Sequence, residues 1–326
     1  MCGIFTISKN IEFNKDTILN EFNKSKNRGG IPPDDTKFID VGKYYIGFHR
    51  LSINGLNSTS NQPFYKNGTY LICNGEIYNY KDLYNKLGIK PQTESDCEII
   101  IDLYQLYPID YILNIIDGVF AFIIYDTRKD LIIVARDPFG VRPLFYDISY
   151  SCFSSELKQI HNLTKNEINQ FLPGHYYNSK NNDGYPTLIK YSSLSQLYLP
   201  YIQQFKNFGD EYSFFKSLVR DTLINSVQKR LLSDRPIACL LSGGLDSSLI
   251  TSIVVKLLKN FTNKPLETYS IGLPGSTDLL YAKKVSEYLN TDHTEIIMSE
   301  DDFFNAIPHV IETIESYDTT TVRASV

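Results

Sequence analysis

The chain has 326 residues, enough for roughly two domains of ordinary size. Hydrophobic residues make up 42% of the sequence and charged residues 21%, so the chain can bury a core and is not a disordered segment. Its 32 Lys and Arg are outnumbered by 37 Asp and Glu. The resulting net charge of −5 argues against nucleic acid or an anionic membrane as the main partner.

The five cysteines are scattered along the chain, and no two of them form a Cys-x-x-Cys pair. This pattern favours a reducing compartment over a disulfide scaffold or a zinc module. No apolar run approaches the ~20 residues of a membrane span, and the apolar stretch at 4–7 is too short for a signal peptide. We therefore expect a cytoplasmic protein. The cysteines are Cys2, Cys73, Cys97, Cys152 and Cys239.

Residues 2–190 are predicted to form one mixed, largely antiparallel α+β domain, because short β-rich runs alternate with turn residues. A helix is expected over 96–107, with Ser95 or Asp96 as its N-cap. A turn-rich segment at 178–184 is typical of a hairpin tip. The predicted strands are 44–48, 69–73, 119–125, 131–135, 144–146 and 151–154.

Residues 191–210 lack periodicity and are predicted to be a linker to a second domain, 211–326, in which strands alternate with helices. Such alternation predicts a parallel sheet. The apolar run 237–241 is typical of a strand buried on both faces. The other elements expected here are a helix with an apolar face over 214–227, helices over 248–259, 279–289 and 301–315, and strands over 268–271 and 294–297.

Cys2 is the first candidate catalytic residue. Methionine is commonly removed before a small residue, which would give Cys2 both a thiol and a free α-amine. That amine titrates near pH ~8. It can accept the thiol proton directly or through water and so activate the sulfur for nucleophilic attack.

An acyl transfer by such a thiol also needs donors for an oxyanion and fixed charges for the substrate. The Asn74 amide and the Gly75 N–H could supply the donors. Arg50 could bind a carboxylate, and Glu76 and Asp96 could hold an ammonium. Each residue alone has an ordinary explanation as a surface ion pair, a turn or a helix cap.

Together, these and neighbouring segments resemble the class II glutamine amidotransferase domain, an N-terminal-nucleophile fold built as an αββα sandwich. The resemblance implies that Cys2 attacks the amide carbonyl of glutamine, releases ammonia and forms a thioester that water hydrolyses. The segments are Met-Cys-Gly-Ile at 1–4, Arg-Leu-Ser-Ile at 50–53, Gln-Pro at 62–63, Asn-Gly-Glu-Ile-Tyr-Asn at 74–79, Ser-Asp at 95–96, and Arg-Asp-Pro-Phe-Gly-Val-Arg-Pro-Leu at 136–144.

By position, the resemblance implies that Arg50 holds the α-carboxylate of glutamine, Asp96 holds its α-ammonium, and Asn74 with Gly75 forms the oxyanion hole. The loop from Arg28 to Asp35 carries extra residues relative to the family's Arg-Gly-Pro-Asp element, so we expect its closure to differ. The glutamine-binding residues implied are Arg50, Leu51, Ser52, Ile53, Asn54, Asn74, Gly75, Glu76 and Asp96.

In the second domain, Ser-Gly-Gly-Leu-Asp-Ser-Ser at 242–248 follows a predicted strand and precedes a predicted helix. Glycines and hydroxyls at a helix N-terminus direct backbone N–H groups toward an anion. The segment has no Walker A spacing, and it resembles the pyrophosphate loop of ATP pyrophosphatases. The resemblance implies that Leu240 and Ile271 flank the adenine and that Asp246 contributes to a Mg²⁺ site. The phosphate-binding residues implied are Ser242, Gly243, Gly244, Asp246, Ser247 and Ser248.

The two domains in this order resemble the glutamine-hydrolysing asparagine synthetase family over the whole chain. The resemblance implies ATP and Mg²⁺, adenylylation of aspartate, and displacement of AMP by ammonia from glutamine. Thr320, Thr321 and Arg323 match the stretch that contributes to the aspartate site of the family. The resemblance also allows a homodimer.

We expect the synthetase part to be truncated, because the family's domain continues with a second glycine-rich acidic loop that does not occur here. The fold class predicted is an α+β N-terminal-nucleophile sandwich followed by an incomplete α/β parallel-sheet ATP-pyrophosphatase domain. Three functions stay open at this point: an asparagine synthetase, a stand-alone glutaminase, and an inactive remnant that binds a partner. Amidophosphoribosyl transfer is disfavoured, because it would not need the 242–248 loop.

Overall fold

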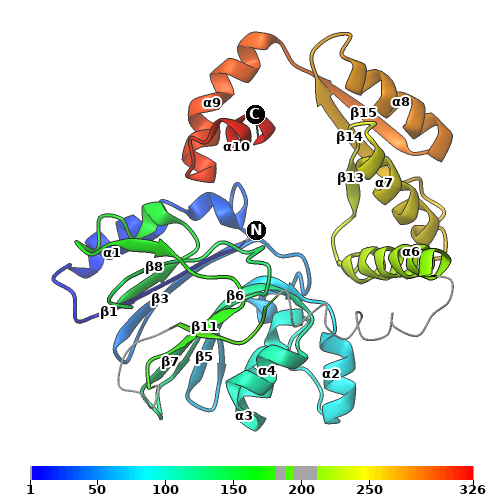
Figure 1. Ribbon diagram of the computed structural model, residues 1–326. Coiled ribbons are helices and arrows are strands. Elements are labelled where there is room, and N and C mark those ends of the chain that lie inside the picture. Colours follow the sequence, from blue (N-terminus) through cyan, green and yellow to red (C-terminus); the bar gives the residue numbers. More distant parts are fainter. Residues whose placement is uncertain (1, 181–187, 194–210, 326) are drawn as a thin grey trace. The chain divides into compact units, whose positions relative to one another are not determined.

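Figure 1 shows the computed structural model, which describes residues 2–180, 188–193 and 211–325, the side chains of 211 and 323–325 excepted. The chain divides into two compact units, Met1–Phe208 and Gly209–Val326. Most of the predicted linker, 194–210, lies outside the described residues, so the domain boundaries at 190 and 211 stay predictions. Met1 and part of the predicted hairpin tip, 181–187, lie outside them too.

Unit 1 contains two antiparallel six-stranded sheets. The first has the order β10-β8-β9-β1-β3-β2, and the second has the order β12-β11-β7-β6-β5-β4. The strands of the first are β1 (Gly3–Ser8), β2 (Asp35–Val41), β3 (Tyr44–Arg50), β8 (Phe145–Asp147), β9 (Cys152–Ser154) and β10 (Ile168–Gln170). Those of the second are β4 (Phe64–Lys66), β5 (Thr69–Ile77), β6 (Gly118–Asp126), β7 (Leu131–Arg136), β11 (His175–Asn178) and β12 (Leu188–Lys190).

Three apolar clusters separate four layers of structure in unit 1. Ile4, Phe48 and Ile123 belong to the cluster between the two sheets. Outside the first sheet, a second cluster packs it against α1 (Lys15–Asn23) and the short helix η4 (Leu157–Gln159). Outside the other sheet, a third cluster packs it against α2 (Tyr80–Leu87), α3 (Ile99–Leu106) and α4 (Ile109–Ile115) (Figure 1). The predicted αββα sandwich is confirmed.

Burial on both faces explains why the central strands read as continuous apolar runs. In β6, Phe120 and Phe122 face the helices, whereas Ala121 and Ile123 face the other sheet. All six predicted strands are present. The predicted helix at 96–107 begins as a short 3₁₀ turn, η3 (Asp96–Glu98), capped by Ser95, and continues as α3. Three strands that the sequence did not predict, β1, β2 and β10, complete the first sheet.

Unit 2 contains the predicted parallel sheet, with the order β13-β14-β15 among its described residues. Helices alternate with these strands as expected. The elements are α6 (Glu211–Arg230), β13 (Ala238–Leu240), α7 (Leu245–Leu258), β14 (Glu267–Gly272), α8 (Thr277–Leu289), β15 (Asp292–Ile297), α9 (Glu300–Ile314) and α10 (Thr319–Ser325).

The prediction that 237–241 is buried on both faces is wrong. Leu241 is buried, but Leu240 is 83% exposed. Among the described residues of unit 2, helices cover the sheet face that carries Thr268 and Ser270, and no helix packs on the face that carries Leu240. The predicted apolar face of α6 is buried only near its end, because the apolar cluster of unit 2 reaches Val227 and not Val219, which is exposed.

Candidate active site

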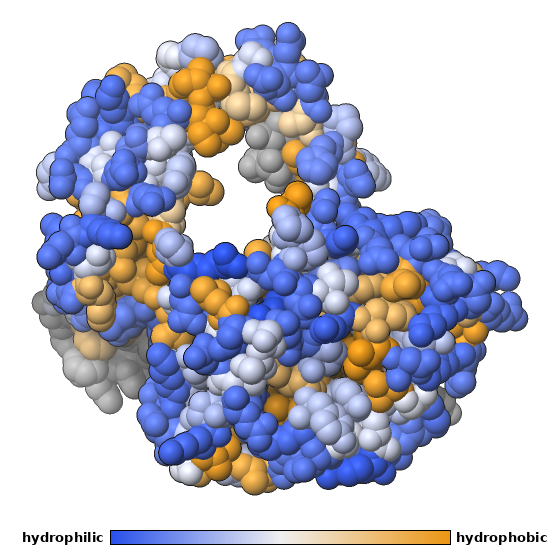
Figure 2. All heavy atoms as spheres, turned by 180° about the vertical axis from the view of Figure 1, so that it is seen from behind, coloured by the Kyte–Doolittle hydropathy of each residue, from blue (hydrophilic) through white to orange (hydrophobic). Residues whose placement is uncertain are grey.

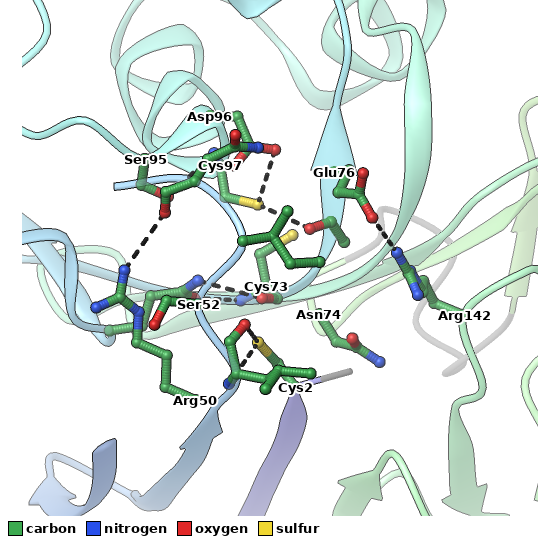
Figure 3. Close-up of a pocket in the computed structure, with 15 residues that line it drawn as sticks. Cys2, Arg50, Ser52, Cys73, Asn74, Glu76, Ser95, Asp96, Cys97 and Arg142 are labelled. Atoms are coloured by element: carbon green, nitrogen blue, oxygen red, sulfur yellow. Dashed lines mark hydrogen bonds and ion pairs between the residues drawn. The ribbon is translucent and has the colours of Figure 1, made fainter. Parts of the chain in front are cut away.

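A cavity of about 30 Å³ lies in unit 1 beside Cys2, at the ends of β1 and β3 and along the second half of β5 (Figure 3). All ten residues predicted for the glutamine site line it, although they come from four separate segments of the chain. Five further residues complete its wall. The lining residues are Cys2, Arg50, Leu51, Ser52, Ile53, Asn54, Gln62, Cys73, Asn74, Gly75, Glu76, Ser95, Asp96, Cys97 and Arg142.

Cys2 is held just before β1 by contacts from two other segments. Its Sγ lies 3.4 Å from both the backbone N and the O of Leu51. Arg28 donates from Nε to the Cys2 carbonyl at 2.8 Å and forms an ion pair with the buried carboxylate of Glu156 at 3.1 Å. Burial raises the pKa of the Cys2 thiol, so a base is needed to form the thiolate at neutral pH.

Asn74 and Gly75 lie in β5, paired with Ala121 and Phe120 of β6. Asn74 is 1% exposed, and its Nδ2 has no hydrogen-bond partner among the described residues. A Cβ on Gly75 would lie 2.5 Å from the Val119 carbonyl oxygen, so only glycine fits there. The site therefore has a buried N–H₂ group without an acceptor among the described residues, in the wall of the same cavity as Cys2.

Two carboxylates lie across the cavity from the thiol. Asp96 accepts a hydrogen bond from the Ile77 backbone N–H at 2.7 Å, and burial, reinforced by the nearby charge of Glu76, raises its pKa to about 6. Glu76 forms a 2.7 Å ion pair with Arg142. A buried carboxylate with a raised pKa gains most when a cation binds to it, because the cation offsets the lost hydration.

The Arg50 guanidinium lies at the cavity wall, but much of its donor capacity is used by the loop that follows β3. It donates to the Asn57 carbonyl at 3.0 Å and to the Asn54 carbonyl at 3.4 Å. It also donates to the Gly55 carbonyl and to Asn61 Oδ1. These contacts tie the Arg50 guanidinium to the loop whose residue Asn54 also lines the cavity.

The altered loop from Arg28 to Asp35 closes on itself and on the cavity wall. Its Gly30 pairs with Pro33. Asp34 Oδ2 accepts hydrogen bonds from the Ser52 N–H at 2.7 Å and from its hydroxyl at 2.6 Å. A Cβ on Gly29 would lie 2.5 Å from Pro33 Cβ. The altered loop therefore holds Ser52, one of the cavity residues, through the carboxylate of Asp34.

Arg142 is a site residue that the sequence analysis quoted in a motif without giving it a role. Its loop is organised by Arg136, which donates from Nε to the Arg142 carbonyl and from Nη2 to the Gly140 carbonyl, both at 2.7 Å. Asp137 accepts from the backbone N–H groups of Val141 and Arg142. In the sequence, only the motif at 136–144 marked Arg142, because its ion-pair partner, Glu76, lies far away along the chain.

Gln62 was also quoted without a role. Its Oε1 accepts from the Cys73 N–H at 2.6 Å, and its Nε2 donates to the Cys73 carbonyl at 3.2 Å. This pair of bonds holds β5 directly before Asn74. Cys73 and Cys97, which also line the cavity, carried no sequence signal.

In unit 2, the predicted phosphate loop runs from the end of β13 into α7. The hydroxyls of Ser242 and Ser247 are hydrogen-bonded at 2.9 Å, and the Ser248 hydroxyl donates to the Gly244 carbonyl at 2.6 Å. Gly243 has φ +75°, and a Cβ there would lie 2.4 Å from the backbone N of Ala282 in α8. Glycine is therefore required for the loop to pass close to α8.

Leu240 and Ile271 lie on the same face of the parallel sheet, because Leu240 is paired with Tyr269, two residues before Ile271. Both side chains are exposed, next to the loop. Asp246 is exposed in the first turn of α7. This arrangement offers an apolar platform beside a helix N-terminus, which suits a base joined to phosphates.

Thr320 and Thr321 are exposed in the first turn of α10, where Asp318 Oδ1 accepts from the N–H and the hydroxyl of Thr321, both at 2.9 Å. The side chain of Arg323 lies outside the described residues. No group of three or more His, Cys, Asp or Glu in the described part of the chain could hold a metal ion.

Hydrophilic side chains cover most of the molecular face in Figure 2. Within the described ranges, none of the helices has the length and the apolar character needed to cross a membrane.

The fold and the cavity define a glutamine amidotransferase domain, and residues 1–197 match the family of that description. The chain belongs to this family. Residues 218–326 match the family described as asparagine synthase.

The relatives carry the name of one enzyme. The chain is 36% identical to "Asparagine synthetase [glutamine-hydrolyzing]" of Gallus gallus and 38% identical to that of Mesocricetus auratus. It is 36% identical to "Probable asparagine synthetase [glutamine-hydrolyzing]" of Acanthamoeba polyphaga mimivirus. Each match covers 100% of this chain and 61%, 61% and 62% of the respective relative. The chain thus spans about 61% of the length of such relatives.

Proposed function

We propose that unit 1 hydrolyses glutamine with Cys2 as the nucleophile, after removal of Met1. The α-amine of Cys2 takes the thiol proton, and the sulfur attacks the amide carbonyl. The developing oxyanion accepts hydrogen bonds from Asn74 Nδ2 and the Gly75 N–H. The α-ammonium of Cys2 returns its proton to the amide nitrogen, so that collapse of the intermediate breaks the C–N bond and releases ammonia, and water then hydrolyses the thioester to glutamate.

The substrate is held at its other end by charge. Asp96 binds the α-ammonium, with Glu76 beside it, and Arg50 exchanges loop carbonyls for the α-carboxylate. Residues 51–54 line the remaining wall. Because the pKa of Asp96 is about 6, its carboxylate is charged at neutral pH and available to the ammonium.

The observation that carries this proposal is the unpartnered Asn74 amide. A buried donor without an acceptor costs roughly 1–3 kcal/mol, so an unpaired donor in the wall of a cavity gains most from a ligand that supplies an acceptor. Asn74 Nδ2 is such a donor, and it lines the same cavity as the Cys2 thiol.

We propose further that the chain belongs to an asparagine synthetase that amidates L-aspartate with this ammonia, yielding L-asparagine, glutamate, AMP and pyrophosphate. The loop 242–248 would hold the ATP phosphates, with Leu240 and Ile271 against the adenine. Mg²⁺ would arrive with the phosphates, since it needs only one or two carboxylates from a protein, and Asp246 is suitably placed. Thr320, Thr321 and Arg323 are proposed for the aspartate site.

The family match of residues 218–326 and the glycine-dependent loop support this proposal. We also propose that the protein is cytoplasmic and forms a homodimer. We propose that its partners are small molecules and that it binds neither nucleic acid nor a membrane. Its net charge of −5 and its free cysteines agree with that assignment.

One endpoint assay tests both halves. The full chain is incubated with glutamine, aspartate and Mg-ATP, and glutamate, asparagine and AMP are quantified together. Equal amounts of all three support the synthetase. Glutamate alone supports a stand-alone glutaminase and contradicts synthesis by this chain. No glutamate, in a protein whose mass shows that Met1 has been removed, contradicts the nucleophile assignment.

A further inference from the structure

Three of the five cysteines border the cavity of unit 1. Cys2 reaches it from the end of β1, Cys73 from β5 and Cys97 from η3. Figure 3 shows the sulfur atoms of Cys73 and Cys97 together on one side of the cavity and that of Cys2 apart from them. Cys152 packs in the apolar cluster beneath α1 and does not line this cavity.

Cys73 and Cys97 lie in the same apolar cluster and border the same cavity. The neighbouring Cys73 thiol, together with burial, holds the pKa of the Cys97 thiol well above its usual value, and Cys97 Sγ lies 3.5 Å from the Gly75 carbonyl oxygen. Both residues are almost fully buried, at 1% and 2% exposure, whereas Cys2 is only half-buried. An oxidant that enters the cavity therefore meets Cys2 first and the pair behind it second.

Hydrogen peroxide is small enough to enter this cavity as it stands, because a space of about 30 Å³ holds roughly two water molecules. A thiol that its own amine activates for attack on an amide is also a good target for peroxide, because the thiolate is the reactive form in both reactions.

We propose that Cys73 and Cys97 are a resolving dithiol for Cys2. Peroxide oxidises the Cys2 thiol to a sulfenic acid with release of water. Cys73 attacks the Cys2 sulfur, and the hydroxyl leaves as a second water. Cys97 then attacks the Cys73 sulfur, which forms the Cys73–Cys97 disulfide and returns Cys2 as a free thiol. Overall, one peroxide and two thiols give one disulfide and two waters.

Such a pair protects the nucleophile from further oxidation, which would be irreversible at the sulfinic acid stage. The role of Cys2 in this inference rests on the proposed glutaminase function, but formation of the Cys73–Cys97 disulfide can be measured without any activity. The link would join the residue before Asn74 to the residue after Asp96, so it would also report directly on the geometry of the site.

The test is a short pulse of hydrogen peroxide on the full chain, followed by thiol blocking, peptide mapping by mass spectrometry and glutaminase assay before and after dithiothreitol. We expect wild type to show the Cys73–Cys97 disulfide and to recover its activity. Cys97→Ser and Cys73→Ser should instead accumulate the sulfinic acid of Cys2, which carries two added oxygen atoms. After dithiothreitol they should recover at most about one tenth of the activity that wild type recovers. Cys152→Ser, a buried cysteine outside the cavity, should behave as wild type.

Recovery of the Cys97→Ser and Cys73→Ser proteins to the wild-type level, or a wild-type map without the Cys73–Cys97 disulfide, overturns the proposal. If a serine variant does not fold, the peptide map of oxidised wild type still tests the proposal, because it shows whether the Cys73–Cys97 disulfide forms. A wild type that forms this disulfide but never hydrolyses glutamine overturns the proposed function and supports the dithiol. A wild type that hydrolyses glutamine but forms only a Cys2–Cys73 disulfide overturns the assignment of Cys97.

Discussion

The two candidate sites of this chain are built in opposite ways. The cavity of unit 1 collects side chains from distant segments and buries them, so that Asn74, Asp96 and Arg50 are each 5% exposed or less. The loop of unit 2 is one continuous segment, and most of its residues are open to solvent. A buried site can shift pKa values and leave donors unpaired before substrate arrives, whereas an open loop relies on the charge of its ligand to organise it.

Of the variants that distinguish the two sites, Cys2→Ala should have the largest effect on activity. Glutamine hydrolysis should fall by at least about 10³-fold, because the nucleophile is lost. Asparagine formation from added ammonia, if the chain supports it, should be unchanged, because the loop of unit 2 does not need the thiol. The measurement is glutamate release and ammonia-dependent asparagine formation on the same preparation. Hydrolysis at the wild-type rate would remove Cys2 from the mechanism.

Asn74→Ala should lower kcat for glutamine hydrolysis by roughly 10²–10³-fold, the usual effect of losing one oxyanion donor, with little change in KM. The variant removes a buried donor that has no partner among the described residues, so the stability of unit 1 should stay the same or rise by up to about 3 kcal/mol. Gln62→Ala is the matched comparison and should destabilise unit 1, since it removes two hydrogen bonds to the Cys73 backbone. A kcat of Asn74→Ala within a few-fold of wild type would contradict the oxyanion role.

Gly243→Ala tests the open site. A Cβ at φ +75°, 2.4 Å from the backbone of α8, should destabilise unit 2 by on the order of 1–3 kcal/mol. Gly244→Ala is the control, because its nearest neighbour would be the Ser242 hydroxyl at 3.4 Å. Denaturant unfolding of both variants gives the comparison, and glutamine hydrolysis should be unaffected in each. Equal stability of the two variants would contradict the close packing of the loop on α8.

Asp96→Asn should separate binding from stability. Glutamine KM should rise, because the ammonium loses its carboxylate. Stability at pH 7 should increase by at most about 3 kcal/mol, since the pKa of Asp96 is raised from 3.8 to about 6 in the folded protein. Because the folded protein holds the Asp96 proton more tightly than the unfolded chain does, wild type loses stability as the pH rises from about 4 to 6. The measurement is the free energy of unfolding of both proteins at pH 7 and at pH 3.5.

At the lower pH the Asp96→Asn protein and wild type should be nearly equally stable, because Asp96 is then protonated in the folded chain and mostly protonated in the unfolded chain. In wild type, the KM for glutamine should rise as pH falls through about 6. An Asp96→Asn protein that is less stable than wild type at pH 7 would show that the carboxylate is stabilising and contradict this account.

The sequence predicted the two sites unequally well. The loop 242–248 was recognised whole, because its glycines and hydroxyls are neighbours in the chain and act on one helix end. The glutamine residues were predicted one by one through resemblance, and they do line a single cavity. Arg142 had no role until the structure paired it with Glu76. The position of Cys73 and Cys97 beside one cavity had no sequence signal, because two ordinary apolar positions hold them.

The burial of Leu240 was predicted wrongly for a related reason. A continuous apolar run indicates that a strand is suited to burial on both faces, but which face is covered depends on the helices packed against the sheet. β1 and β2 were missed because one is a short apolar stretch at the chain start and the other begins with three polar residues and lacks regular alternation. Both strands are fixed by pairing with β3, a long-range interaction.

The sequence by itself determined the local features: the central strands of unit 1, the alternation of strands and helices in unit 2, the thiol at position 2, and the strand–loop–helix element of unit 2. These follow from interactions between residues a few positions apart. The tertiary structure alone decided that Asn74 lacks a partner, that Asp96 is desolvated and that three thiols share one cavity. Burial and the pairing of polar groups depend on segments brought together from across the chain, and no local pattern in the sequence encodes them.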